Sequence, residues 1–167
     1  MKCVYKKNNV ELLEYRPLLF KPLYINFEPM RLIRRIRFLK EYLGNGHYKV
    51  YYLKVDDEYV GYCVVAPGGR RLKCSTEQDI VIGPYYINKQ KRGNGYSELL
   101  VKLTLENCSY CYNYAFDWVE KNNIASRKTS ENVGFTKYGE LNVTPVLRRL
   151  VIVNCGNDIV FRFQRKK

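Results

Sequence analysis

The middle of this chain holds a short apolar run, a basic turn with two glycines and a helical segment, in that order. The run is Asp79–Ile87, with Gly83 and Pro84 inside it, and the turn leads through Gly93-Asn94-Gly95 into leucine-rich residues up to about Asn107. An apolar run bounded by turn residues predicts a strand, and the proline predicts a bulge or a sheet edge, because proline cannot donate a ladder hydrogen bond. A strand that passes directly into a helix indicates an α/β or α+β fold around a sheet.

Two further helices are expected. A helix over Met30–Leu43, ended by Gly44-Asn45-Gly46, is predicted by aliphatic residues at the spacing of one helix face, which are Leu32, Ile36, Leu39 and Leu43. Its other faces carry basic residues. A short helix over Ala125–Asn132 should stop at Gly134. Prolines break Glu11–Leu23, so any helix there is short or bent.

Strands account for most of the remaining chain. They are predicted over Lys2–Lys6, Tyr48–Val55, Tyr59–Val65, Tyr112–Val119 and Phe135–Leu141. Asp56-Asp57-Glu58 reads as a hairpin turn between the second and third of these. Leu147–Val153 and Ile159–Arg165 flank Gly156-Asn157-Asp158 and predict a C-terminal hairpin. The pattern as a whole indicates a mixed sheet with flanking helices.

Composition limits the class of protein and of partner. The length, 167 residues, favours a single domain over residues 1–167, and 46% hydrophobic residues exclude a disordered or collagen-like chain. The 29 Lys and Arg exceed the 16 Asp and Glu by 13, and the pI is about 9.5. Such an excess favours an anionic partner: nucleic acid, a membrane surface or a phosphorylated small molecule.

The N-terminal residues and the cysteines indicate the cellular location of the protein. No apolar signal region follows the first lysines, and no apolar run reaches the roughly 20 residues of a membrane span. We therefore expect a cytoplasmic protein whose six cysteines are reduced thiols. Cys108 and Cys111 have the spacing of a redox or zinc pair, but no second pair completes a metal site and His47 is the only histidine. We expect both cysteines to be packing residues, and no metal.

The basic turn has the chemistry of a phosphate site. Gly93 and Gly95 can adopt positive φ and let the backbone approach a ligand closely. The N–H groups at the start of the following helix attract an anion, and the helix dipole favours negative charge. Lys89, Lys91 and Arg92 add positive charge. A Walker loop is absent, because no Gly-Lys-Ser/Thr follows, and Glu98 replaces the third glycine of a dinucleotide site.

This turn resembles motif A of the GNAT superfamily of N-acetyltransferases, Gln/Arg-x-x-Gly-x-Gly/Ala. Two registers fit: one begins at Arg92 and ends on Ser97 in place of the last glycine, and the other runs from Gln90 to Gly95. We prefer the first, which leaves a normal spacing from Ile87 and places Leu100 and Val101 where the family has paired apolar residues.

A second segment strengthens the resemblance. The family's later motif is a strand ending in valine, an asparagine four residues on, a short helix and Gly-Phe. In this sequence these fall on Val119, Asn123, a small residue at Ser126, and Gly134-Phe135. The two motifs stand in the expected order, and the resemblance spans roughly Tyr48–Leu141. Asn123 also suits a helix N-cap, and one residue can serve both purposes.

The resemblance implies a GNAT-like fold, mixed and mostly antiparallel, in which splayed strands form a V-shaped cleft for acetyl-CoA. Pyrophosphate would be held by Arg92, Gly93, Asn94, Gly95, Tyr96 and Ser97. Strand amides of Tyr85 and Ile87 would bond the pantetheine arm, and Asn123 would bond the arm or a nearby water. A strand amide would also stabilise negative charge that develops on the thioester carbonyl.

The proton-transfer groups are less well defined by the sequence. A carboxylate must take the proton of the attacking amine, and Glu77 and Asp79 lie at the start of the strand where several family members place it. Asp117 on the next strand is a further candidate, and each of the three is also explained as a loop or strand acid. The family's usual tyrosine acid, four residues before the glycine of Gly-Phe, is replaced by Ser130, a much weaker acid.

Three functions stay open at this point. The first is an N-acetyltransferase that moves the acetyl group of acetyl-CoA to a primary amine of a small molecule or sugar. If the basic early helix borders the acceptor site, an acidic or phosphorylated acceptor is expected. The second is a basic module that binds anions or nucleic acid, although that charge is also explained as one solvated helix face. The third is a GNAT-fold protein that binds CoA without catalysis. A monomer and a homodimer fit the sequence equally.

Overall fold

The computed structural model of the chain describes residues 1–29, 32–45, 48–69, 72, 74–143 and 150–165. It falls into two compact units. Unit 1 comprises Met1–Ala66 and Pro84–Cys108, and unit 2 comprises Pro67–Gly83 and Ser109–Lys167. Strand β5 (Ile80–Ile87) therefore gives its first residues to unit 2 and its last residues to unit 1.

Unit 1 is built on an antiparallel meander. Its strands are β1 (Lys2–Lys7), β2 (Val10–Tyr15), β3 (Lys49–Val55) and β4 (Glu58–Pro67), which hydrogen-bond in that order. The turn between β3 and β4 has Asp56 and Asp57 at φ 49° and 63°, which is the conformation of a tight hairpin turn. The hairpin predicted at Asp56-Asp57-Glu58 is confirmed. The last part of β5 follows β4 in the sheet, where the Asn88 N–H donates to the Val60 carbonyl at 2.8 Å.

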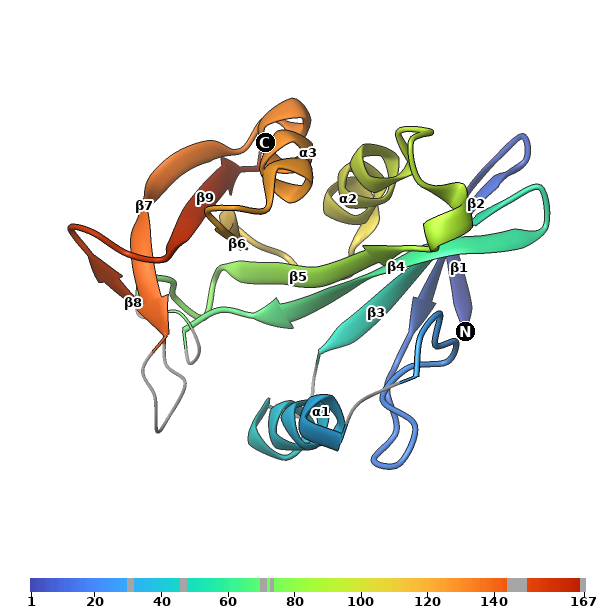
Figure 1. Ribbon diagram of the computed structural model, residues 1–167. Helices are drawn as coiled ribbons and strands as arrows, with labels where there is room; N and C mark the ends of the chain where they lie inside the picture. The colour runs from blue at the N-terminus through green and yellow to red at the C-terminus, as the bar shows by residue number, and fades with distance from the viewer. Residues whose placement is uncertain (30–31, 46–47, 70–71, 73, 144–149, 166–167) are drawn as a thin grey trace. The chain divides into compact units, whose positions relative to one another are not determined.

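Helices cover both faces of these strands. Helix α2 (Tyr96–Asn107) contacts β1, β2 and β3, and helix α1 (Leu32–Asn45) lies on the opposite side (Figure 1). The core beneath α1 is rich in aromatic rings: Phe38 of the helix joins a cluster with Tyr15, Tyr48, Val50, Tyr52, Tyr62, Val64 and Leu23. Alternate residues of β3 and β4 supply this cluster, because side chains of a strand point to opposite faces in turn.

One expectation for unit 1 is wrong. The sequence predicts at most a short or bent helix over Glu11–Leu23, but the first residues of this segment belong to strand β2, and Pro17 follows the end of that strand. In β2, Val10 lies opposite Val55 and Tyr15 opposite Val50. The predicted helix is confirmed as α1; its aliphatic stripe is exposed, and Phe38 is buried. Met30 and Gly46, at the predicted ends of this helix, lie outside the described residues.

Unit 2 has a sheet of mixed direction. The first part of β5 pairs in parallel with β6 (Tyr114–Glu120), at Ile80–Ala115 and Val81–Phe116. The order continues with β9 (Asp158–Gln164), β7 (Thr136–Val143) and β8 (Leu150–Val153), all antiparallel. Helix α3 (Ile124–Val133) packs against β6.

The predicted C-terminal hairpin is also wrong. β8 pairs with β7, whereas β9 lies between β6 and β7. Four consecutive residues of β9, Asp158 to Phe161, are buried, as in a central strand covered on both faces. An edge hairpin would have left one of those faces to water. Residues 147–149 of the predicted hairpin lie outside the described residues.

The fold class is therefore the predicted mixed α/β class, with a mostly antiparallel sheet and flanking helices. The single domain and the V-shaped cleft stay predictions. No helix in the described ranges is long and apolar enough to cross a membrane. All six cysteines are free thiols; Cys108 is buried as expected, but Cys111 is exposed.

Candidate functional site: the glycine turn and a buried acid

The turn between β5 and α2 is held in shape by its own polar groups. The Asn88 side chain accepts a hydrogen bond from the Gln90 N–H, at 3.3 Å, and begins a single 3₁₀ turn over Lys89–Lys91. The Asn94 amide donates to the carbonyls of Lys91 and Arg92, at 3.2 and 3.3 Å. The loop is therefore ordered by local bonds that need no ligand.

Two glycines set the direction of the backbone in this turn. Gly93 and Gly95 have φ of 83° and 72°, the left-handed region that other residues rarely adopt. A Cβ at either position would meet nothing within 4 Å, so the conformation, and not space, requires glycine. Gly95 is also the N-cap of α2, and no side chain caps this helix start. The first turn of α2 thus presents backbone donors, and the open space above both glycines leaves room for an anion.

The basic residues of the turn already have partners. Lys89 Nζ lies 2.9 Å from Glu28 Oε1, and Lys91 forms an ion pair with Glu58. Arg92 Nε donates to the Ile87 carbonyl at 3.2 Å, and its guanidinium lies 5.2 Å from the Tyr86 ring centroid. The hydrogen bond from Lys89 holds the pKa of Glu28 below its usual range. These cations therefore fix the loop, and the acids beside them offset part of their charge.

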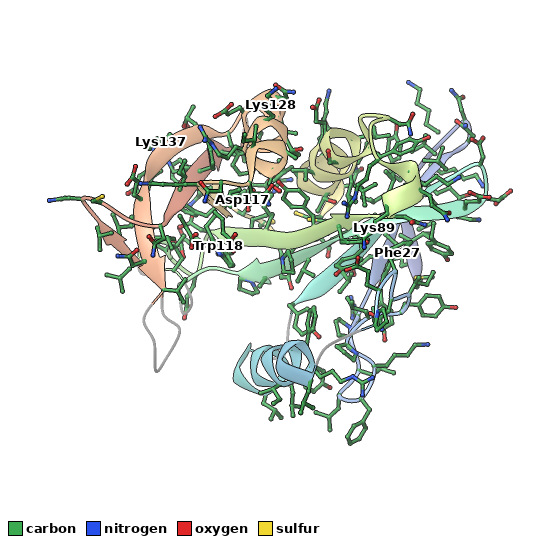
Figure 2. The ribbon with its side chains drawn as sticks, in the orientation of Figure 1. Phe27, Lys89, Asp117, Trp118, Lys128 and Lys137 are labelled. Atoms are coloured by element: carbon green, nitrogen blue, oxygen red, sulfur yellow. The ribbon has the colours of Figure 1, made fainter. Side chains whose placement is uncertain are left out.

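Stacked aromatic rings position Glu28. The Phe27 ring lies 6.2 Å from Tyr62 and 5.9 Å from Tyr86, with interplanar angles of 11° and 23°. Figure 2 shows Phe27 and Lys89 near each other in unit 1. No local sequence pattern predicts that Glu28 pairs with Lys89, because the two residues are far apart along the chain.

The end of β5 packs closely against β4. A Cβ on Gly61 of β4 would lie 2.4 Å from the Tyr86 carbonyl oxygen. The Asn88 N–H points to β4, where it donates to the Val60 carbonyl. The predicted role of the Tyr85 and Ile87 amides toward the pantetheine arm stays a prediction. Further back in the strand, Gly83 has φ 100°, so β5 has the irregularity predicted at Gly83-Pro84.

In unit 2, Asn123 and Gly134 bound helix α3. The Asn123 side chain accepts from the Ser126 N–H at 3.1 Å and is the N-cap, and Gly134 ends the helix at φ 101°. The structural role that the sequence suggested for Asn123 is thus confirmed. Its role toward CoA stays a prediction.

The Asp117 carboxyl of β6, labelled in Figure 2, is buried, and it bonds to Ser130 of α3. Ser130 Oγ lies 2.8 Å from Asp117 Oδ2 and 3.1 Å from the Ser126 carbonyl oxygen. Burial raises the pKa of Asp117 to about 7, although the bonds from Ser130 and from the Trp118 N–H lower it in part. The Ser130 hydroxyl donates to Asp117 Oδ2 and also lies within hydrogen-bond distance of the Ser126 carbonyl oxygen, so its one proton is shared between two acceptors.

The two other carboxylates named from the sequence lie in unit 2. Asp79 is buried; Oδ2 accepts from the Thr76 N–H and hydroxyl, both at 2.8 Å, and Oδ1 accepts from the Tyr114 N–H at 3.1 Å. Both oxygens of Asp79 therefore hold the turn before β5 against the start of β6. Glu77 is exposed. Among the residues that the structure describes, no group of three or more His, Cys, Asp or Glu is placed to hold a metal ion.

Comparison with known proteins identifies a family for most of the chain. The model of the acetyltransferase (GNAT) family matches residues 14–135. A comparison with curated protein sequences finds no match.

Several solved acetyltransferases are similar in fold. The microcin C7 self-immunity acetyltransferase MccE, in complex with acetyl-CoA and AMP, is 15% identical, covers 95% of this chain and 94% of its own, and has a TM-score of 0.60. The structure of yncA from Salmonella typhimurium, a putative acetyltransferase with acetyl-CoA, is 18% identical; the match covers 81% of this chain and 74% of that one, with a TM-score of 0.54. The Campylobacter jejuni N-acetyltransferase PseH, in complex with acetyl coenzyme A, is 16% identical; the match covers 80% of this chain and 79% of that one, with a TM-score of 0.55.

Proposed function

The chain belongs to the acetyltransferase (GNAT) family, and we propose that it transfers the acetyl group of acetyl-CoA to a primary amine of an acidic or phosphorylated small molecule or sugar. The observation that carries this proposal is the turn at Gly93–Gly95: two left-handed glycines at a helix start that no side chain caps. That arrangement binds a pyrophosphate through backbone N–H groups. The acidic acceptor is inferred from the net charge of +13.

The glycine turn would bind the phosphates of acetyl-CoA. Arg92, Gly93, Asn94, Gly95, Tyr96 and Ser97 would hold the pyrophosphate. The backbone amides of Tyr85 and Ile87 would bond the pantetheine arm, and the remaining acceptor capacity of Asn123 would serve the same arm. Because hydrogen bonds within the turn fix its backbone, little conformational entropy is lost when the phosphates bind.

The acceptor amine must lose a proton as it attacks the thioester. Glu77 and Asp79 are our candidates for the base, and Glu77 is the more accessible to an amine, because both oxygens of the buried Asp79 already hold the turn before β5. The exposed carboxylate of Glu77 would accept the proton directly or through water.

The departing thiolate needs a proton, and Ser130 is our candidate to deliver it. Serine alone is too weak an acid, but Ser130 Oγ lies 2.8 Å from a buried carboxyl whose pKa is about 7. As the carbon–sulfur bond breaks, the Ser130 proton would move to sulfur and the Asp117 proton would move to Oγ. The serine stays neutral and Asp117 becomes the carboxylate, which solvent reprotonates after product release.

Acetyl-CoA binding is the first test of the proposal. Saturating acetyl-CoA should raise the Tm, with a stabilisation of roughly 2.7 kcal/mol at a hundredfold excess over Kd. Unchanged melting at millimolar acetyl-CoA would contradict both the site and the activity.

Release of free CoA thiol, measured against a panel of phosphorylated, carboxylated and neutral amines, is the second test. Faster release with the anionic amines supports the acceptor class, and faster release with neutral amines contradicts it. A Tm shift without release for any amine would favour a CoA-binding protein that is not a catalyst.

A further inference from the structure

Helix α1 exposes an aliphatic stripe that none of the described residues of unit 1 covers. Leu32, Ile36, Leu39 and Leu43 are 73%, 55%, 40% and 70% exposed, although they share one helix face. The helix packs on unit 1 through Phe38, on a different face. Single exposed leucines are normal on protein surfaces, but a continuous stripe of four marks an interaction site.

A second apolar projection precedes the helix in the chain. Leu18 and Lys21 bond to each other through their backbones, at 3.0 and 3.2 Å, and close a tight turn. This turn exposes Leu18, Leu19 and Phe20, and Phe20 is 92% exposed. The segment that joins β2 to α1 lies on the same side of the unit 1 strands as α1 itself (Figure 1).

The charge around both projections is strongly positive. Residues 16–41 contain seven Lys and Arg but only two acidic residues, and one of the two, Glu28, is paired with Lys89. Arg35 lies on α1 and is exposed. Exposed Leu, Ile and Phe combined with Lys and Arg are typical of elements that lie in the interface of an anionic bilayer.

We propose that the apolar side chains of α1 and of the Leu18–Lys21 turn dock unit 1 on an anionic lipid surface, with the leucines and Phe20 in the headgroup region and the exposed side chains of Lys21 and Arg35 against lipid phosphates. Neither signal alone gives stable attachment, whereas apolar insertion and basic attraction together do. A second copy of the chain fits less well, because it would bring two basic faces together.

An acidic amphipathic helix from another protein is the competing partner. The 4-3-4 spacing of the stripe suits a helix seam. Such a helix would cover α1, but it would leave the separate turn with Phe20 in water. A lipid surface accommodates both projections, and the distribution of apolar groups over two segments favours it.

Co-sedimentation of the full chain with vesicles tests the proposal. We expect binding to vesicles with about 30% phosphatidylglycerol to be at least about tenfold stronger than to phosphatidylcholine alone, and to weaken several-fold between about 0.1 M and about 0.5 M NaCl. The double substitution Leu32→Gln with Leu43→Gln keeps helix propensity and charge and should lower binding about tenfold, and Phe20→Ser should lower it several-fold.

Ile124→Gln is the matched control, because Ile124 is 63% exposed on a helix of unit 2. It should leave vesicle binding unchanged, and thermal melts should show all variants folded. Failure to bind anionic vesicles, equal binding to both vesicle types, or equal loss with Ile124→Gln would overturn the proposal. So would a dimer that the Leu32 and Leu43 substitutions dissociate in sedimentation velocity, since the stripe would then be a contact between copies.

Discussion

The turn at Asn88–Gly95 and the pair formed by Asp117 and Ser130 are both polar, but only the turn lies at the protein surface. In the turn, charged groups stand at the surface and each cation lies beside a partner, as Lys89 lies beside Glu28. Asp117 is buried in unit 2, and the Ser130 side chain that bonds it is neutral. The pKa of Glu28 is consequently lowered by a hydrogen bond, whereas the pKa of Asp117 is raised by burial.

This contrast assigns the two regions different tasks. A surface turn with fixed backbone donors is suited to bind an anion, because its conformation does not depend on the protonation of any side chain. A buried acid with a pKa near 7 is suited to exchange a proton at neutral pH. Substitutions in the first region should therefore change affinity for CoA, and substitutions in the second should change pH dependence.

The largest expected effect is on stability after Asp117→Asn. The folded pKa of about 7 exceeds the ordinary value of 3.8, so the folded state retains a proton that the unfolded state loses. The contribution of Asp117 to the free energy of unfolding is therefore full below about pH 4, falls as the pH rises and is lost above about pH 7. The difference between the two limits is on the order of 4 kcal/mol. Asn cannot ionise, so the variant should lack this fall. Urea unfolding between pH 4 and 8 measures the free energy of unfolding of both proteins. The same pH dependence in both would contradict the buried acid. Ser130→Ala is the control: it keeps Asp117 and should retain the fall in stability.

The next effect is on CoA affinity at Gly95. Gly95→Asp places a carboxylate where the pyrophosphate would bind, and we expect a loss of about 100-fold, since like charges a few ångströms apart repel by several kcal/mol at intermediate dielectric. Gly95→Asn is the matched control, because asparagine tolerates positive φ and carries no charge. Titration calorimetry with CoA should separate the two variants, and equal losses would show that backbone conformation, and not charge, decides affinity.

Ser130→Ala should have a smaller effect, on rate alone. Removing the hydroxyl should lower kcat about tenfold or more, in the range of a lost general acid, and leave the KM for acetyl-CoA within about twofold. In the native enzyme kcat should fall as pH rises through about 7, where Asp117 loses its proton, and this limb should be absent in the variant. Retention of the limb after Ser130→Ala would rule out the proposed proton path.

The smallest effect is expected at the ion pair beside the turn. Glu28→Gln keeps the size of the side chain and removes a negative charge 2.9 Å from Lys89. CoA should then bind about twofold more tightly at low ionic strength and equally at high ionic strength, because exposed charges are screened by salt. CoA titrations at two salt concentrations measure this, and weaker binding would indicate that Glu28 supports the loop conformation.

Local patterns predicted the parts of the fold that depend on local physics. Asp56 and Asp57 predicted a hairpin turn, Gly95 predicted a helix start, and Asn123 predicted an N-cap; the structure has all three. Each depends on φ preferences or on hydrogen bonds that span a few residues.

Features decided by distant residues were not predictable in the same way. β2 was missed because the prolines after Tyr15 suggested a broken helix, whereas pairing with β3 decides the strand. The place of β9 between β6 and β7 depends on partners elsewhere in the chain, and its run of consecutive apolar residues, Ile159-Val160-Phe161, was the one signal of a central strand. The spacing of Leu32, Ile36, Leu39 and Leu43 correctly predicts one face of helix α1, but spacing alone cannot tell which helix face packs on the sheet.

The sequence by itself determined the family, the fold class and the chemistry of the turn, because glycine conformation, helix capping and strand alternation are fixed by neighbouring residues. Only the tertiary structure decided what surrounds each charged group. It enclosed Asp117 beside Ser130, committed both oxygens of Asp79 to the turn before β5, placed Glu28 beside Lys89 and left the leucines of α1 exposed. Solvation and partner charges set a pKa, and both come from segments distant in sequence, so they exist only once the chain has folded.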